Sequence, residues 1–251
     1  MKTEFHLTKK NQTLTIMPLG DIHYGSPNCN TNYFEFALNK FKNTPGEKIL
    51  YLLGDECDIA VKRQGNSTYQ QKIDVNEQLE YIIQSYQPYK EYINGIVQSN
   101  HMSRTKNELD LDISQIIEEQ LDIPYTNNIY ETLLINDQPY TIYATHGTRT
   151  SNQLHLMQGA MQRNTNHIEA NLFLMGHCHY LNYWSQPRTN TDGYTRRHYL
   201  LTGHFLNYKG SYAEINGLRP NPCGFAKIHI DSNLRTNATL YHEDECKEMI
   251  I

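Results

Sequence analysis

Short apolar runs alternate with segments of helical spacing along the first part of the chain. Phe34, Ala37, Leu38 and Phe41 recur at intervals of three and four residues, which predicts an amphipathic helix over Tyr33–Phe41. Continuous apolar runs predict buried strands at Leu14–Gly20, Lys48–Gly54, Ile93–Gln98 and Asn171–Gly176. Further helices are predicted over Val75–Tyr92 with an irregularity at Pro88, over Glu108–Leu121 before Pro124, and over Asn152–Ile168.

After the helix that ends near Leu121, the pattern changes from helical spacing to strands. The runs ETLLI and PYTIYAT flank Asn136-Asp137-Gln138 and predict a β-hairpin, and later strands are predicted over Tyr194–Thr202 and Ala226–Ile230. No repeat, charge block or linker of Pro and Ser divides the chain, so residues 1–251 are interpreted as one domain. Strands that alternate with helices, followed by a strand-rich part, predict an α/β protein with mixed sheets.

Composition and charge mainly exclude classes of protein. The 251 residues are 38% hydrophobic and 20% charged, which is typical of a folded chain. No apolar run approaches the length of a membrane span and none follows the first lysine, so we expect neither a membrane segment nor a secretory signal. A net charge of −5 offers no overall attraction for nucleic acid or anionic membranes. Five scattered cysteines without a C-x-x-C pair favour a reducing, cytoplasmic location.

Several of the predicted strands end at side chains that bind metals or titrate. These positions are Asp21-x-His23, Asp55-x-x-Asp58, Asn100-His101, His146-Gly147 and His177-x-His179. Because ligands of open α/β sheets bind outside the carboxyl ends of the strands, we expect these groups to converge on one place. A mixed shell of imidazole, carboxylate and amide oxygen suits Mn, Fe, Zn or Mg better than Cu(I) or an iron–sulfur cluster.

Taken in order, the strand-end blocks resemble a known family. The blocks are G-D-I-H (20–23), G-D-E-C-D (54–58), N-H (100–101), T-H-G (145–147) and G-H-C-H (176–179). In this order they are similar to the calcineurin-like metallophosphoesterase superfamily, over about residues 13–180. Asn100–Arg104 and a segment around Gly210–Gly224 also resemble short phage and bacterial members. The resemblance implies a four-layer α-β-β-α sandwich of two mixed β-sheets flanked by helices.

The same resemblance implies a site with two divalent metal ions, with manganese placed first and Fe, Zn, Ni or Mg as alternatives. The implied ligands are Asp21, His23 and His179 for one ion, Asn100, His146 and His177 for the other, and Asp55 between them. His101 is expected to protonate or steer the leaving oxygen, with Asp58 orienting its ring. Arg104 and Asn100 are expected to contact the substrate, and a hydroxide between the metals is expected to attack phosphorus in line.

Three departures from the family pattern refine the expected function. Ser99 and Met102 flank Asn100-His101 where the family usually has Gly and Glu, and Ile59 stands where its protein phosphatases carry Arg. Ile59 makes a phosphoprotein phosphatase an alternative, and the resemblance to nucleases and phosphodiesterases of the superfamily implies a phosphodiesterase or nuclease that acts on a nucleotide or nucleic acid in the cytoplasm, which is the host cytoplasm if the protein is phage-encoded. A phosphomonoesterase or phosphoprotein phosphatase, and a non-catalytic metal-binding scaffold, stay open as alternatives. The metal, the substrate and the oligomeric state are not determined by the sequence.

Some residues outside the blocks are secondary candidates. Basic residues that can hold a substrate phosphate are Lys62, Arg63 and Arg149, and those that can track a polynucleotide are Arg188, Arg196 and Arg197. For all of these a solvated surface position is the default interpretation. His204 is a candidate for lining the pocket, whereas Cys57 and Cys178 are expected to pack away from the metals.

Overall fold

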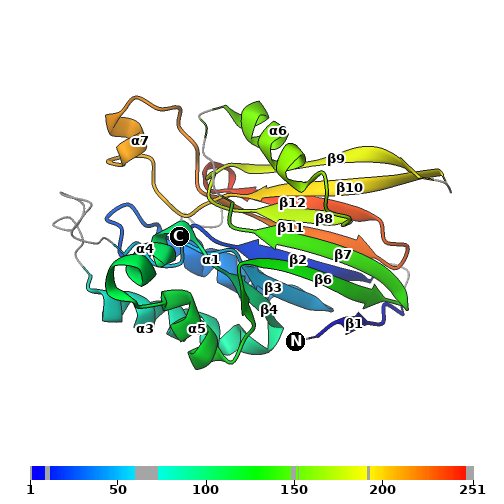
Figure 1. The fold of residues 1–251 in the computed structure, drawn as a ribbon, viewed down its shortest axis with the longest axis horizontal. Helices are drawn as coiled ribbons and strands as arrows, with labels where there is room; N and C mark the ends of the chain where they lie inside the picture. Colours follow the sequence, from blue (N-terminus) through cyan, green and yellow to red (C-terminus); the bar gives the residue numbers. More distant parts are fainter. Residues whose placement is uncertain are drawn as a thin grey trace.

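Two six-stranded sheets form the centre of the protein (Figure 1). The computed structural model describes residues 2–8, 12–59, 73–147, 151, 153–190 and 193–246. The first sheet consists of β1 (Glu4–Phe5), β6 (Asn128–Ile135), β7 (Gln138–Thr145), β8 (Leu172–Met175), β9 (Leu181–Asn190) and β10 (Gly193–Thr202). The second consists of β2 (Thr13–Leu19), β3 (Lys48–Leu52), β4 (Ile93–Val97), β5 (Tyr125–Thr126), β11 (Gly224–Asp231) and β12 (Thr236–His242).

Both sheets are mixed. The first has the order β1-β6-β7-β8-β10-β9, in which β7, β8 and β10 are parallel and β9 is antiparallel to β10. The second has the order β12-β11-β2-β3-β4-β5, in which β2 to β5 are parallel and β11 is antiparallel to β2. The carboxyl ends of several parallel strands therefore meet at one edge of each sheet.

Helices cover the outer faces of both sheets (Figure 1). Those on the second sheet are α1 (Thr31–Lys42), α3 (Val75–Tyr86), α4 (Asn100–Leu109) and α5 (Ile113–Leu121), and α6 (Leu154–Thr165) covers the first sheet. The short elements are η2 (Gln87–Tyr92), α7 (Tyr212–Ile215) and η3 (Glu243–Glu245). Among the described residues, no helix has both the length and the apolar character needed to cross a membrane.

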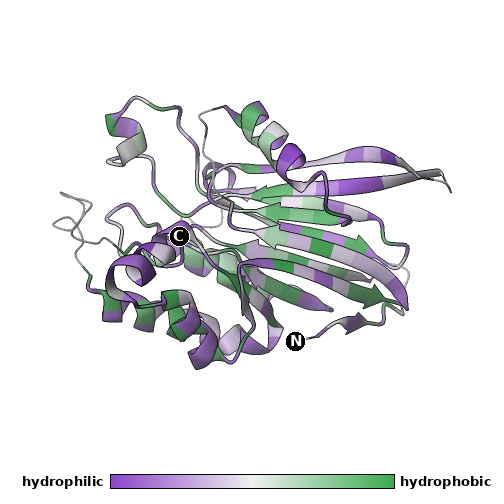
Figure 2. Cartoon of the chain, viewed as in Figure 1, coloured by the Kyte–Doolittle hydropathy of each residue, from purple (hydrophilic) through white to green (hydrophobic). Residues whose placement is uncertain are grey.

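Alternation along the strands separates the core into layers. In β3, Leu50 and Leu52 pack toward the helices, whereas Ile49 and Tyr51 lie between the two sheets. In β8, Leu172 and Leu174 face the second sheet, while Phe173 and Met175 pack on the α6 side. Successive side chains of a strand point to opposite faces, so an apolar run with no polar position indicates burial on both faces. Figure 2 shows these strands as largely hydrophobic. The expected α-β-β-α sandwich is confirmed.

Two predicted helices differ from the structure. The single helix predicted over Glu108–Leu121 corresponds to two elements, the end of α4 and all of α5. The two helices are separated at Asp110, which has a left-handed backbone with a φ of 54°. The continuous helix predicted over Val75–Tyr92 ends at Tyr86 and gives way to the 3₁₀ turn η2. Pro88 explains the second difference, because proline lacks an N–H and its ring clashes with the preceding turn of an α-helix.

Candidate metal centre

The residues predicted from the strand ends come together at one end of the two sheets. Asp21 and His23 follow β2, and Asp55 follows β3 in the second sheet; His146 follows β7, and His177 and His179 follow β8 in the first sheet. Asn100 is the first residue of α4, directly after the β4 turn. Three groups result, each with side-chain ligand atoms within 4.8 Å of one another, the third being His23 with Asp58 and His101. The two that consist only of predicted ligands are the first cluster, Asp21 with His23 and His179, and the second cluster, Asp55 with His146 and His177.

The first cluster brings two ring nitrogens face to face. Nε2 of His23 lies 3.3 Å from Nε2 of His179, and Oδ1 of Asp21 lies 3.4 Å from His179 Nε2 and 3.8 Å from His23 Nε2. Two imidazole lone pairs and a carboxylate oxygen that point at the same place are an arrangement that a divalent cation satisfies.

The second cluster is oriented by the backbone. Nδ1–H of His146 donates to the carbonyl oxygen of Leu53 at 2.7 Å, which directs Nε2 toward Asn100 and Asp55. This Nε2 lies 2.7 Å from Oδ1 of Asn100 and 3.2 Å from Oδ2 of Asp55. The amide oxygen, the imidazole and the carboxylate are thus held around one point, with His177 as the remaining member of the cluster.

Asp55 belongs to the second cluster and also faces the first. Its Oδ1 accepts a hydrogen bond from the backbone N–H of His101 at 3.1 Å, while its Oδ2 lies 3.2 Å from His146 Nε2 and 3.9 Å from His23 Nε2. Burial by itself would raise the pKa of Asp55, but the hydrogen bond and positive charge of His146 hold it well below its usual range. A single ionised oxygen therefore faces both clusters.

The residues present fit divalent cations. Asp21 is fully buried; its Oδ2 accepts from the backbone N–H of His177 at 2.8 Å, but its Oδ1 has no hydrogen-bond partner among the described residues. A buried carboxylate oxygen without a partner is costly unless a cation is bound to it. Carboxylate, imidazole and amide oxygen together suit Mn, Fe, Zn or Mg. Asp21, His23, His179 and Asp55 would hold one ion, and Asp55, Asn100, His146 and His177 the other.

Most of these positions have an unusual backbone. Asp21, His23, Asp55, His177 and His179 all have φ between 51° and 63°. Residues other than glycine adopt this left-handed region uncommonly, and such residues concentrate at functional sites. The sequence carries no signal for this feature beyond the glycines that precede three of the blocks.

His101 lies beside the first cluster and is neutral. Its ring centroid is 4.7 Å from that of His23, and burial, together with the positive charges of His23 and Arg104, lowers its pKa to about 4. Asp58 Oδ1 lies 3.4 Å from His101 Nδ1 and also 3.4 Å from His23 Nδ1. Arg104 Nη1 lies 3.3 Å from His101 Nδ1. Asp58 therefore lies beside two histidines, whereas the sequence predicted a contact with His101 alone.

The residues that depart from the family pattern lie in the core. Met102 is 1% exposed, and its sulfur accepts a hydrogen bond from the Ser114 hydroxyl at 3.4 Å. Ile59 and Cys57 are buried in the same apolar cluster, and Cys178 packs under α6 while also bordering the metal centre. Ser99 is the N-cap residue of α4, and its side chain accepts no capping hydrogen bond from the helix. Met102 therefore packs in the core and does not face the metal ligands.

A cavity of about 460 Å³ opens on the two clusters. It is lined by His101, Arg104 and His204, by several residues between 206 and 221, and by five of the predicted ligands: His23, Asp55, Asn100, His177 and His179. The predicted site residues therefore lie together, either in the lining of this cavity or in the two clusters. The exception is Asp58, which lies behind His101, 3.4 Å from its Nδ1. The segment around Gly210–Gly224 is part of the family resemblance, but the sequence predicted no site role for residues 206–221. The candidates Lys62, Arg63 and Arg149 lie outside the described residues.

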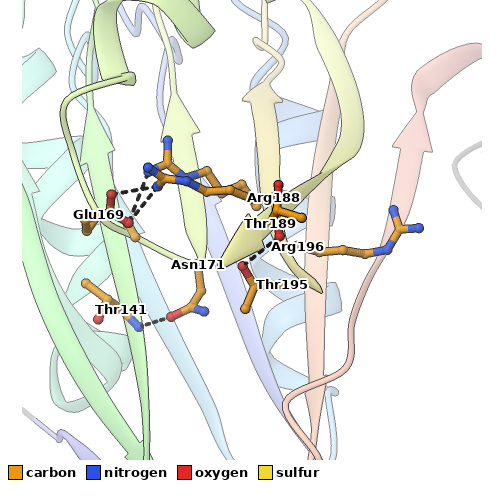
Figure 3. A pocket seen from close by; sticks show the side chains of 9 residues that line it. Thr141, Glu169, Asn171, Arg188, Thr189, Thr195 and Arg196 are labelled. Carbon is orange, nitrogen blue, oxygen red and sulfur yellow. Dashed lines mark hydrogen bonds and ion pairs between the residues drawn. The ribbon is translucent and has the colours of Figure 1, made fainter. Parts of the chain in front are cut away.

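The remaining arginine candidates surround a separate cavity of about 440 Å³ (Figure 3). Arg188 forms an ion pair with Glu169 at 2.7 Å and Arg197 one at 3.2 Å, whereas Arg196 points away from Glu169. Asn171, which precedes β8, also lines this cavity, while His177 follows β8. The cavity is therefore at the opposite end of β8 from the metal ligands, and Glu169 neutralises part of its charge.

Fold and site together define an α/β sandwich protein with a candidate metal centre, in which all five blocks of the family resemblance meet. No family model and no curated protein matches the chain. Among solved structures it is similar to a predicted phosphoesterase from Streptococcus pneumoniae, with 13% identity, 92% of this chain and 98% of that chain covered, and a TM-score of 0.38. It is also similar to Vps29 complexed with zinc from Entamoeba histolytica, with 13% identity, 91% and 98% covered, and a TM-score of 0.41.

Proposed function

We propose that the chain is a phosphoric ester hydrolase that depends on two divalent metal ions and acts on phosphodiesters of nucleotides or nucleic acids. The observation that carries this proposal is the place of Asp55, whose Oδ2 lies 3.2 Å from His146 Nε2 and 3.9 Å from His23 Nε2. Two-metal hydrolases need an anion shared by two neighbouring cations, and this oxygen is suited to that task. The order and content of the five blocks support a place in the calcineurin-like metallophosphoesterase superfamily.

When bound, the two cations would supply Lewis acidity toward the phosphoryl oxygens and a water of lowered pKa for attack. The chain's own residues then position the ester. Arg104 lines the cavity over the metal centre beside His101, and its guanidinium can donate hydrogen bonds to two phosphate oxygens of the ester.

His101 is suited to stabilise the leaving oxygen. Arg104 donates to Nδ1 of the neutral ring, which leaves the proton of His101 on Nε2. A hydrogen bond from this Nε2–H can stabilise the negative charge that develops on the leaving oxygen. The Nδ1–H of His23 donates to Asp58, so Asp58 fixes the tautomer in which Nε2 of His23 faces Asp21 and Asp55.

Hydrolysis of bis-p-nitrophenyl phosphate with Mn²⁺ tests the proposal. We expect turnover by the wild-type protein and a loss of about 10²-fold or more in kcat for His101→Ala, with two Mn²⁺ still bound. Turnover that is unchanged in His101→Ala would contradict the role of His101. Two bound ions without any hydrolysis would favour the non-catalytic scaffold, and a preference for p-nitrophenyl phosphate would favour a phosphomonoesterase.

A further inference from the structure

Residues 206–221 form one wall of the cavity over the metal centre; we refer to them as the wall segment. Asn207, Tyr208, Leu218 and Arg219 from this segment line the same cavity as the metal ligands. The segment contains α7, which lies at the same end of the molecule as α4, the helix that carries Asn100 and Arg104 (Figure 1).

His204 holds both ends of the wall segment. Its Nδ1 accepts a hydrogen bond from the backbone N–H of Leu206 at 3.1 Å, and its Nε2–H donates to the carbonyl oxygen of Asn221 at 3.2 Å. The ring is 4% exposed and stacks on His179, with ring centroids 5.0 Å apart. Because both nitrogens are used, His204 has no nitrogen left for a metal or a substrate. Its contacts instead place the wall segment against the metal centre.

Further hydrogen bonds fix the conformation of the wall segment and attach it to neighbouring segments. The side-chain amide of Asn221 donates to the carbonyl oxygen of His179. The Tyr208 hydroxyl donates to the carbonyl oxygen of Leu218 at 2.7 Å, and the Asn207 side chain accepts from Asn30 at 3.0 Å. A binding wall that is ordered before the ligand arrives lowers the entropic cost of binding.

The wall segment places a positively charged side chain, Arg219, at the cavity. Arg219 is exposed and lines the cavity, and no carboxylate of the described residues lies within ion-pair distance of it. The carboxylate of Glu214, the acidic residue of the same segment, instead accepts from the backbone N–H of Gly210 at 2.6 Å. Arg188 and Arg197 at the other cavity are different, because both pair with Glu169.

We propose that the wall segment is the specificity element of this site, that Arg219 binds a second anionic group of a compact phosphodiester, and that His204 is the positioning residue for this contact. This inference rests on the proposed function. A cavity of about 460 Å³ is in the range that holds a ligand of nucleotide size, and an arginine at its wall suits a terminal phosphate. The favoured substrate is therefore a short nucleotide phosphodiester that carries a further phosphate.

The dinucleotide TpT and its 5′-phosphorylated form pTpT differ only in this second anionic group. We expect kcat/KM of the wild-type protein with Mn²⁺ to be about tenfold or more higher for pTpT than for TpT, as for one charge-assisted hydrogen-bonded pair. Arg219→Gln should bring the pTpT-to-TpT ratio close to one. Arg196→Gln is the matched control, because Arg196 is an exposed arginine that belongs to the other cavity, and it should keep the wild-type ratio.

His204→Phe separates positioning from stability. Phenylalanine retains a ring to stack on His179 but removes both hydrogen bonds to the wall segment. We expect this variant to bind two Mn²⁺ and to lose most of the preference for pTpT. A residue with only a structural role would lower stability and both activities together and leave the ratio unchanged, which would overturn the positioning role.

The inference can fail independently of the proposed function. A wild-type ratio near one, or a ratio that Arg219→Gln leaves unchanged, overturns the role of Arg219 even when bis-p-nitrophenyl phosphate is hydrolysed. If no ester is hydrolysed, the proposed function fails, and calorimetric binding of pTpT and TpT to the Mn²⁺-loaded protein still decides the inference. The same binding comparison in the His101→Ala background gives the ratio without appreciable turnover.

Discussion

At the scale of single residues, the metal centre depends on backbone conformations that are unfavourable for its side chains. Asp21, His23 and Asp55 have φ values of 51° to 54°, a region that costs a non-glycine residue about 1–2 kcal/mol. Backbone hydrogen bonds between the two loops hold them there, from the Asp21 N–H to the Gly54 carbonyl at 2.9 Å and from the His23 N–H to the Asp55 carbonyl at 2.8 Å. Each loop thereby determines the direction of the other loop's ligands.

Gly176 offers a test of this tight packing. A Cβ atom at Gly176 would lie 3.0 Å from Oδ2 of Asp21, the oxygen that the His177 N–H holds. We expect Gly176→Ala to displace the Asp21 carboxylate and weaken Mn²⁺ binding by about tenfold, as other changes behind metal ligands do. Isothermal titration calorimetry with Mn²⁺ measures the effect.

Gly159→Ala in α6 is the control for this substitution. Its Cβ would meet only the end of the flexible Arg163 side chain, at 3.2 Å. Since alanine favours a helix interior, this variant should be more stable by up to about 1 kcal/mol and should bind Mn²⁺ as the wild type does. Unchanged Mn²⁺ affinity in Gly176→Ala would show that Asp21 does not need its present position.

At the scale of elements, α4 connects the metal centre to the core. Its first residue, Asn100, faces His146, and two positions later Met102 points into the apolar cluster under the second sheet. The helix is polar apart from Met102 and Leu109, so helical spacing of apolar residues did not predict it. Its position depends on the Met102 contact with α5 and on the strand β4 that precedes it.

Met102→Glu places the carboxylate that the family pattern usually has at this position. Because Met102 is 1% exposed, we expect the glutamate to be buried without a partner and to lower the free energy of unfolding by about 3 kcal/mol or more. Met102→Leu, which retains an apolar side chain of similar size, should lower it by less than about 1.5 kcal/mol. Urea unfolding measures both values. Equal stability of the two variants would mean that residue 102 is not a core position.

At the scale of the whole molecule, the metal centre joins the two sheets. Asp21, His23 and Asp55 belong to loops of the second sheet, and His146, His177 and His179 to loops of the first. Ions bound between these loops would stabilise the folded state, because the unfolded chain does not hold the ligands together.

Manganese should therefore raise the melting temperature. At 100 times the dissociation constant, a bound ion adds about 2.7 kcal/mol, which corresponds to roughly 5–10 °C for a chain of this size. We expect EDTA to reverse the shift and Asp55→Asn to remove most of it in differential scanning calorimetry. Asp137→Asn, in the exposed turn between β6 and β7, is the control and should retain the full shift. A full shift in Asp55→Asn would contradict a shared Asp55.

The predictions from sequence succeeded where the pattern is local and strong. The buried strands β2, β3, β4 and β8 lie within one or two residues of the predicted runs, because strands buried on both faces are continuously apolar. The turn at Asn136-Asp137 joins β6 and β7, as the hairpin prediction requires. The predictions were wrong at Asp110 and at the end of α3, where a left-handed residue and a proline end helices that apolar spacing alone would continue.

The sequence by itself determined the architecture and the chemical identity of the candidate ligands, because apolar runs, strand ends and the order of the blocks are properties of the chain. Only the tertiary structure decided which oxygen of Asp55 faces both clusters, that Asp58 lies beside two histidines, and that residues 206–221 close the cavity. These features depend on distances between segments far apart in the chain. Such distances arise only when both sheets pack against each other and bring the carboxyl ends of their strands together.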